Sequence, residues 1–170
     1  MKLINHFING AHYQGQEKNT VEVFNPATGE VAARVALASK QETEEAIRVA
    51  TEALSSWSNT PPLKRARVMF KFKELLEKHI DDLASMVTSE HGKVFSDAKG
   101  EIARGIEVVE FACGIPQLLK GEYMEQVGTG VDSYSVRQPL GVCAGITPFN
   151  FPVMVPMWMF PMAIAFGNTF

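Results

Sequence analysis

The chain has 170 residues, of which 46% are hydrophobic and 21% charged, and its formal net charge is −3. These values are typical of a globular protein with one ordinary domain or two small ones. No long run of one charge sign is present, so the basic patch of a nucleic-acid-binding protein is missing and we expect no nucleic-acid partner. Cys113 and Cys143 lie in apolar surroundings, which favours reduced thiols in a cytoplasmic compartment. The histidines lack metal-ligand spacing, so we expect no metal.

The first part of the chain predicts short strands. The opening stretch MKLINHFING lacks the apolar region of a secretory signal peptide. In HFINGAHYQG, Asn9-Gly10 is the favoured two-residue turn of a β-hairpin. Two further strands are expected around Val21–Phe24 and Val31–Leu37, joined by the turn NPATG.

The middle of the chain predicts four helices. Ser39 and Glu42 form a capping box for the first, whose inward face is expected to be Ile47, Ala50, Leu54 and Trp57. Thr60-Pro61 is expected to begin the second, as a cap residue followed by proline in the first turn. Its predicted buried stripe is Met69, Phe72, Leu76 and Ile80.

The third and fourth helices are expected over residues 81–91 and 96–113. Gly92 is placed to end the third helix in a left-handed conformation. Gly114 and Pro116 interrupt the chain after the fourth. The inward positions of the fourth helix are predicted to be Ile102, Ile106, Val109 and Cys113.

The last third predicts strands and a final helix. Residues 131–139 partly alternate and read as a half-exposed strand. Residues 141–147 are short, apolar and uncharged, which is typical of a strand buried on both faces of a parallel sheet. A helix is expected from about Pro152. The order predicts an α/β fold, and a βα unit this close to Phe170 would need more sheet to pack against.

Residues 138–170 contain no Asp, Glu, Lys, Arg or His, and this length is enough to span a bilayer. However, prolines and glycines recur throughout the segment, and a spanning helix with so many breaks would be unusual. We therefore favour a buried strand followed by a buried helix and expect no membrane partner. Membrane attachment remains the weaker alternative.

Asn150 is the one amide in the apolar stretch GITPFNFPVMVPMWMFP. Pro148 and Pro152 restrict Thr147 and Phe151 to extended geometry, so Asn150 lies between two restrained positions. The carboxyl end of a sheet strand is where ligands bind in α/β folds, and the positive end of the next helix points there. A rigid amide at this place is able to stabilise an oxyanion, by about 3–4 kcal/mol in a comparable site. From the pattern alone we favour the alternative, an asparagine bonded to nearby backbone.

The stretch ITPFNFP resembles the aldehyde dehydrogenase superfamily, whose members usually read PWNFP here. FINGAHYQG, VFNPATGEV, EHGK and GNTF agree with that family in order. The segment PFNFPVMVPMWMFPMAIA is more specific and is similar to the group of CoA-acylating methylmalonate and malonate semialdehyde dehydrogenases. That group has phenylalanine where most relatives have tryptophan. Phe166 departs from the group's usual smaller residue, which implies either a local repacking or an altered reading of the end of the chain.

The resemblance implies a reaction. A cysteine thiolate attacks an aldehyde, and an asparagine amide with a backbone N–H holds the resulting oxyanion; Asn150 matches that asparagine. Hydride then passes to NAD and leaves a thioester. In the CoA-acylating group, CoA accepts the acyl group and the substrate's carboxylate carbon leaves as carbon dioxide or bicarbonate. The implied products are propionyl-CoA from methylmalonate semialdehyde and acetyl-CoA from malonate semialdehyde.

The resemblance also assigns residues. Thr147 and Phe149 match positions that contact NAD. Phe151, Met154 and Trp158 match the lining of the aldehyde tunnel, although their helical spacing equally fits core residues.

Arg104 matches the group's arginine for the substrate carboxylate, which a guanidinium binds bidentately. The alternative for Arg104 is a solvated helix ion pair with Glu101 or Glu107, three residues away on either side.

In members of that family, the nucleophile, the general base and the nucleotide-binding glycines come after the position that matches Phe170. Cys143 in an apolar strand and Cys113 on an apolar helix face are not expected to be the nucleophile. The resemblance therefore implies an N-terminal third that is inactive alone. Its parts would be residues 1–130, an oligomerisation strand at 131–139, and the first βα unit of the NAD-binding domain at 140–170.

The full-length enzyme is expected to be a homo-oligomer acting on a small semialdehyde. Two alternatives to this interpretation stay open. In the first, the short chain is a non-catalytic interaction fragment that associates with a full-length dehydrogenase through its hairpin and residues 131–139. In the second, it is part of another NAD(P)-dependent aldehyde dehydrogenase.

Overall fold

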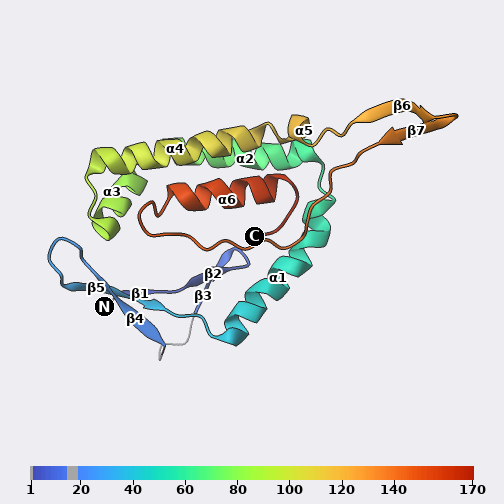
Figure 1. Ribbon diagram of the computed structural model, residues 1–170. Helices are drawn as coiled ribbons and strands as arrows, with labels where there is room; N and C mark the ends of the chain where they lie inside the picture. The colour runs from blue at the N-terminus through green and yellow to red at the C-terminus, as the bar shows by residue number, and fades with distance from the viewer. Residues whose placement is uncertain (1, 15–18) are drawn as a thin grey trace.

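A computed structural model describes residues 2–14 and 19–170. Helices α2 (Pro62–Lys78), α3 (Ile80–His91) and α4 (Phe95–Cys113) form a layer along one side of the molecule. Helix α6 (Met154–Ala165) packs beneath this layer, and a small sheet lies on the other side of α6 (Figure 1). The helices are α1 (Lys40–Ser58), α2 (Pro62–Lys78), α3 (Ile80–His91), α4 (Phe95–Cys113), α5 (Ile115–Leu118) and α6 (Met154–Ala165). The strands are β1 (Lys2–Ile4), β2 (His6–Ile8), β3 (Ala11–Tyr13), β4 (Thr20–Phe24), β5 (Val31–Ala36), β6 (Tyr123–Gly128) and β7 (Val131–Tyr134). The mixed α/β class expected from the sequence is confirmed.

The N-terminal strands follow the sequence prediction closely. β2 and β3 form an antiparallel hairpin, and its turn residues Asn9 and Gly10 have φ values of 56° and 71°, the left-handed geometry that this turn requires. β1, β5 and β4 form a three-stranded sheet in that order, with β1 parallel and β4 antiparallel to β5. The turn between β4 and β5 closes where the Gly29 N–H donates to the Asn25 carbonyl at 2.8 Å.

The capping box of α1 is confirmed. The Ser39 hydroxyl accepts from the Glu42 N–H at 3.2 Å, and the Glu42 carboxylate accepts from the Ser39 N–H at 2.7 Å. The expected inward position of Ile47 is wrong, because this side chain is 53% exposed. The face of α1 that lies toward the β2–β3 hairpin consists of Ala46, Val49, Ala50, Ala53 and Trp57. These residues line a groove between the helix and the hairpin.

The start of α2 lies one residue later than expected. Pro61 is the residue before the helix and Pro62 is its first residue. The Thr60 hydroxyl donates backward to the Ser56 carbonyl at 3.0 Å, so it completes the end of α1 instead of capping α2. Gly92, with φ 82°, ends α3 as expected.

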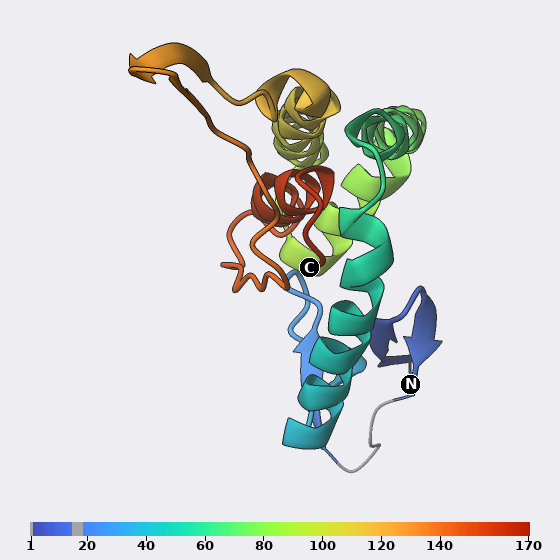
Figure 2. The ribbon, with the colours of Figure 1, turned by 90° about the vertical axis from the view of Figure 1, so that its right-hand side faces the viewer.

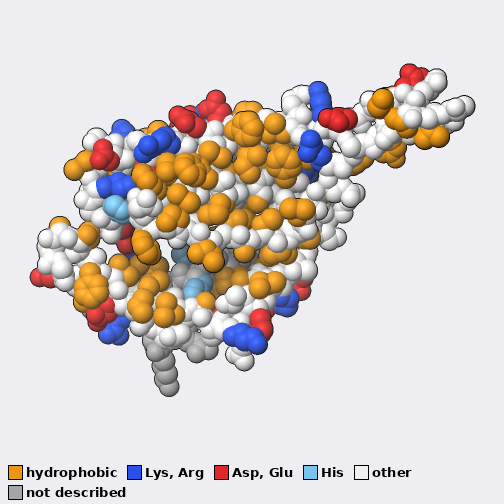
Figure 3. All heavy atoms as spheres, viewed as in Figure 1, with side chains coloured by type: hydrophobic (Ala, Val, Ile, Leu, Met, Phe, Trp, Pro, Cys, Tyr) orange, Lys and Arg blue, Asp and Glu red, His pale blue; other side chains and the backbone are white. Residues whose placement is uncertain are grey.

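The main core forms where α6 packs against α4 and α2. The buried residues of this core are Leu76, Ala84, Val87, Ala98, Ile102, Ile106, Val109 and Met157. A second cluster comprises Ala66, Met69, Ala112, Cys113, Ile115 and Ala165. Gly105 allows the close approach of α4 to α6, because a Cβ added there would lie 3.3 Å from the Cβ of Met157 and would overlap the end of that side chain. Figure 3 shows hydrophobic side chains gathered on the face of the molecule over these helices.

The expected buried strand at 141–147 is wrong for this chain. The segment is extended, but its one bridge among the described residues joins Val142 to Thr169, and Ile146 is 99% exposed. A strand buried on both faces needs neighbouring strands and covering layers. The described residues supply only Thr169, whose carbonyl accepts from the Cys143 N–H at 2.8 Å.

The expected strand at 131–139 is shorter than predicted. β7 covers Val131–Tyr134 and pairs with β6 in a hairpin that projects away from the helices (Figures 1 and 2). Every residue of this hairpin is exposed. The helix expected from about Pro152 is α6. Within the described part of the chain, no helix has both the length and the apolar character to cross a membrane.

Two buried polar side chains hold the ends of the helices together. The Arg65 guanidinium, 4% exposed, donates to the Ala165 carbonyl at 2.9 Å, the Ser58 carbonyl at 3.4 Å and the Thr60 carbonyl. These contacts join the C-terminal ends of α1 and α6. The Asn168 side chain accepts from the Leu140 and Gly141 N–H groups at 2.7 and 3.0 Å, so it fixes the entry to the extended segment.

Candidate active site

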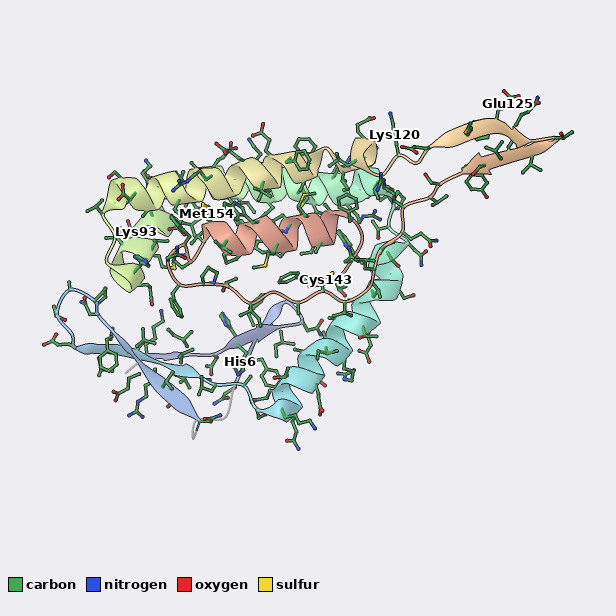
Figure 4. The ribbon with its side chains drawn as sticks, viewed as in Figure 1. His6, Lys93, Lys120, Glu125, Cys143 and Met154 are labelled. Carbon is green, nitrogen blue, oxygen red and sulfur yellow. The ribbon has the colours of Figure 1, made fainter. Side chains whose placement is uncertain are left out.

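The residues around Asn150 are organised by a buried ion pair. Glu101 on α4 is fully buried, and one carboxylate oxygen lies 2.6 Å from the Lys93 Nζ. Its other oxygen accepts from the Val153 and Met154 N–H groups at 2.8 and 3.1 Å. Lys93 lies between α3 and α4, and Met154 begins α6 (Figure 4). The pair therefore connects three helices at one end of the core.

Glu101 is kept ionised by these contacts. Burial acts to raise the pKa of its carboxyl group, but the hydrogen bonds from Lys93, Val153 and Met154 and the attraction of the Lys93 charge outweigh burial and lower the pKa. The first amides of α6 also carry the positive end of the helix dipole, which favours a carboxylate there. A buried charge with every oxygen bonded avoids the large cost of an unpaired one.

Asn150 is held by its backbone and not by its side chain. The Lys93 Nζ donates to the Asn150 carbonyl at 3.0 Å. This is the second hydrogen bond of Lys93, in addition to the one to Glu101. The Asn150 side chain is exposed and makes no hydrogen bond within the described part of the chain. The alternative of an amide bonded to nearby backbone is therefore not what this structure has. The oxyanion role stays a prediction.

Arg104 and Phe151 lie together. The Arg104 guanidinium is 5.5 Å from the centre of the Phe151 ring, and the Lys93 Nζ is 4.5 Å from it. The alternative of a helix ion pair has no support here, because Glu101 bonds Lys93 and α6, and Arg104 forms no ion pair with the described residues. The charge of Lys93 is paired with Glu101, so Arg104 is the cation beside this ring that has no carboxylate partner among the described residues.

The other predicted site residues are more dispersed. Thr147 and Phe149 lie exposed on the extended segment, with Phe149 at 90%. Met154 is buried at 4% in the core, whereas Trp158 on α6 is 49% exposed. The start of α6 follows Asn150 closely, but the amides of its cap residue Val153 and of its first residue Met154 bind Glu101 and are not open to a ligand.

Lys93 and Glu101 were missed as site residues by the sequence reasoning, which treated Glu101 only as a neighbour of Arg104. A signal was present. Glu101 falls at the spacing of Ala98, Ile102 and Gly105 on the buried face of α4, where a carboxylate needs partners. Lys93 lies in the EHGK stretch eight residues earlier.

The two cysteines differ in surroundings. Cys113 is buried, and burial raises the pKa of its thiol. Cys143 is half-buried on the extended segment (Figure 4). The described residues contain no group of three or more metal-ligating side chains that would hold an ion. A reactive thiolate needs an environment that lowers its pKa, and Cys113 has the opposite.

A family model for the aldehyde dehydrogenase family matches residues 12–170. The chain belongs to this family. It is 50% identical over 170 residues to the malonate-semialdehyde dehydrogenase of Pseudomonas aeruginosa and covers 34% of that protein. It is 51% identical over 163 residues, 96% of its own length, to the mitochondrial acylating methylmalonate-semialdehyde dehydrogenase of Arabidopsis thaliana and covers 27% of it.

Solved structures agree with these relatives. One protein of Sinorhizobium meliloti, assigned to the methylmalonate-semialdehyde dehydrogenases and solved with NAD, shares 52% identity and a TM-score of 0.96. The comparison covers 99% of this chain and 34% of that one. The chain thus spans about a third of the length of these relatives, and it corresponds to their N-terminal part. The N-terminal portion of the aldehyde dehydrogenase fold is confirmed.

Proposed function

We propose that this chain is the N-terminal part of an NAD-dependent, CoA-acylating dehydrogenase of malonate or methylmalonate semialdehyde. About half of its residues are identical to those of enzymes named for these substrates. The observation that carries the proposal is the arrangement at residues 150–154. A buried ion pair holds the backbone of Asn150 and leaves its amide open, beside the unpaired cation Arg104.

In this proposal each residue has one task. The Asn150 amide donates a hydrogen bond to the oxyanion that forms when a thiolate, from a residue outside this chain, adds to the aldehyde. The Arg104 guanidinium binds the carboxylate at the other end of the substrate. The Phe151 ring packs against both Lys93 and Arg104 and so keeps the two cations near the backbone of Asn150.

The fit of NAD depends on the extended segment. The exposed Thr147 hydroxyl and the backbone of residues 144–149, which forms no backbone hydrogen bond in the described part of the chain, offer polar groups to a cofactor. The amides at the start of α6 do not, since Glu101 occupies them. When bound, NAD accepts the hydride. CoA is the proposed acyl acceptor.

A chimera tests the proposal. Residues 1–170 would replace the aligned third of the Pseudomonas aeruginosa enzyme, with which they align along their whole length. We expect CoA-dependent NADH formation from malonate or methylmalonate semialdehyde. The 170-residue chain alone is expected to give none, since the family's nucleophile and base are not within it. A folded chimera that is inactive beside an active parent enzyme would overturn the proposal. The intact mass of the native protein from its own cells shows whether it carries more chain.

Arg104→Met in the chimera tests the substrate carboxylate. Losing a charge-assisted bond of about 1.5–3 kcal/mol should raise the KM for malonate semialdehyde about 10–150-fold. The rate with propanal, which has no carboxylate, should change little. Steady-state kinetics with both aldehydes measures the difference.

Glu107→Gln is the matched control for Arg104. If Arg104 acted only through a helix ion pair, this variant would affect the enzyme as Arg104→Met does, and both aldehydes would respond equally. We expect that Glu107→Gln does not reproduce the effect of Arg104→Met and that the two aldehydes do not respond equally, because Arg104 forms no ion pair with the described residues.

A second candidate is a non-catalytic interaction role. The β6–β7 hairpin exposes large apolar side chains, with Tyr123 at 65%, Met124 at 64% and Tyr134 at 75%. These side chains are suited to packing against another copy or against a full-length dehydrogenase. Purification of the 170-residue chain separates the alternatives. An interaction fragment would co-purify with a separate dehydrogenase, whereas a catalytic part would act only when joined to the rest of the enzyme's sequence.

A further inference from the structure

The connection from Glu101 to Asn150 runs through a single lysine. The Lys93 Nζ donates to the Glu101 carboxylate at 2.6 Å and to the Asn150 carbonyl at 3.0 Å. Its side chain is 13% exposed, so water competes little for these bonds. Lys93 is thus the direct contact between the buried carboxylate and the residue whose amide faces outward.

Glu101 fixes the other side of the same turn. Its carboxylate holds the Val153 and Met154 amides, three and four residues after Asn150. The backbone from Asn150 to Met154 is therefore bound at both ends by one ion pair. Phe151, inside this stretch, packs its ring against the Lys93 ammonium. Rotation of the Asn150 peptide would break the Lys93 bond, and movement of the helix start would break the Glu101 bonds.

We propose that Lys93 and Glu101 are positioning residues that aim the Asn150 amide at the reacting carbonyl. The inference rests on the proposed function, since it needs an oxyanion for the amide to meet. A hydrogen-bond donor contributes to catalysis only when it is already in place as charge develops. An error of about 1 Å in such a placement costs on the order of 100-fold in rate. The Asn150 side chain makes no hydrogen bond within the described residues, so its position depends on the backbone that the Lys93–Glu101 ion pair holds.

A purely structural clamp is the competing explanation. In that case the pair would only join α3, α4 and α6, and its loss would lower stability without acting through Asn150. A double-mutant cycle distinguishes the two, because residues that act through one another show non-additive effects.

The experiment uses the chimera with malonate semialdehyde, NAD and CoA. Lys93→Met should lower kcat about 10–100-fold and leave the KM for NAD nearly unchanged. In an Asn150→Ala background the same change should cost less than about threefold, because no amide is left to aim. Lys93→Arg keeps the positive charge and several donors and should restore part of the rate. An equal loss in both backgrounds would overturn the inference, as would an unchanged kcat in Lys93→Met.

Lys99→Met is the matched control. Lys99 on α4 forms an ion pair of the same 2.6 Å length with Asp81 on α3, and this pair is more exposed than the Lys93–Glu101 pair. Lys99→Met removes a lysine–carboxylate pair that joins α4 to α3 without contacting Asn150, and it should leave kcat unchanged. A kcat loss in Lys99→Met equal to that in Lys93→Met would assign the effect to general helix packing and refute positioning.

Hydrogen exchange separates this inference from the proposed function. If the unmodified chimera oxidises neither semialdehyde, the proposed function fails and kinetics decide nothing about positioning. Amide exchange over residues 150–154 still tests the anchoring of this backbone by Lys93, without which there is no positioning role. Lys93→Met should speed exchange there relative to Lys99→Met, because the backbone loses its anchor. Unchanged exchange would overturn the positioning role.

Discussion

Asn150→Ala in the chimera is expected to lower kcat about 100- to 1,000-fold, the loss measured when one oxyanion donor is removed elsewhere. The KM for the semialdehyde should change little, because the bond forms only as the oxyanion develops. The free energy of unfolding should stay within about 0.5 kcal/mol, since the Asn150 side chain is exposed and makes no bond within the described residues. Rapid-mixing measurement of NADH formation checks the rate, and urea titration checks the stability.

Asn59→Ala is the control for this substitution. Asn59 is an exposed asparagine after α1 whose side chain donates to the Ser55 carbonyl at 2.7 Å. Its loss should affect stability slightly and kcat not at all. A loss of stability in Asn150→Ala with an unchanged kcat would return Asn150 to a purely structural role.

Arg65→Met is expected to lower the free energy of unfolding of the 170-residue chain by about 3 kcal/mol. The substitution keeps the apolar stem but removes the donor for three carbonyls, those of Ser58, Thr60 and Ala165. Each buried acceptor left without a donor costs about 1–3 kcal/mol, and partial access of water to the end of α1 limits the sum. Urea denaturation with a matched m-value measures the change.

Arg67→Met supplies the comparison, because Arg67 is exposed on the same helix and forms no ion pair with the described residues. It should change stability by less than about 0.5 kcal/mol. Arg65→Lys should recover part of the loss, as one ammonium reaches fewer carbonyls than a guanidinium. Equal stability of the Arg65→Met and Arg67→Met variants would contradict the role given to Arg65.

Local signals in the sequence predicted the local structure. The Asn9-Gly10 turn, the Ser39–Glu42 box and the Gly92 helix end each depend on a few neighbouring residues, and each is confirmed. The inward stripe of α4 was also predictable, because its apolar residues repeat at helical spacing. Such features need no knowledge of distant parts of the chain.

Features that depend on distant partners were not predictable. The apolar run at 141–147 was interpreted as a buried strand, but strand formation depends on neighbours that the described residues do not provide. The exposure of Ile47 depends on which side of α1 meets the hairpin. The contact of Lys93 with Asn150 joins residues 57 positions apart, so no local pattern reveals it.

The Asn168 contacts have a consequence for chain entropy. By bonding Leu140, which lies 28 positions earlier, Asn168 closes a loop that contains Asn150. The entropic cost of closing a flexible loop rises by only about 0.6 kcal/mol when the length of the loop doubles. Gly145 packs closely against Phe170 and Met159, but residues 146–149 are exposed and therefore tolerate insertions at little thermodynamic cost. Residues 150–154 are bound at both ends by Glu101 and Lys93 and do not share that tolerance. Variation in length is expected to accumulate on one side of Asn150 only.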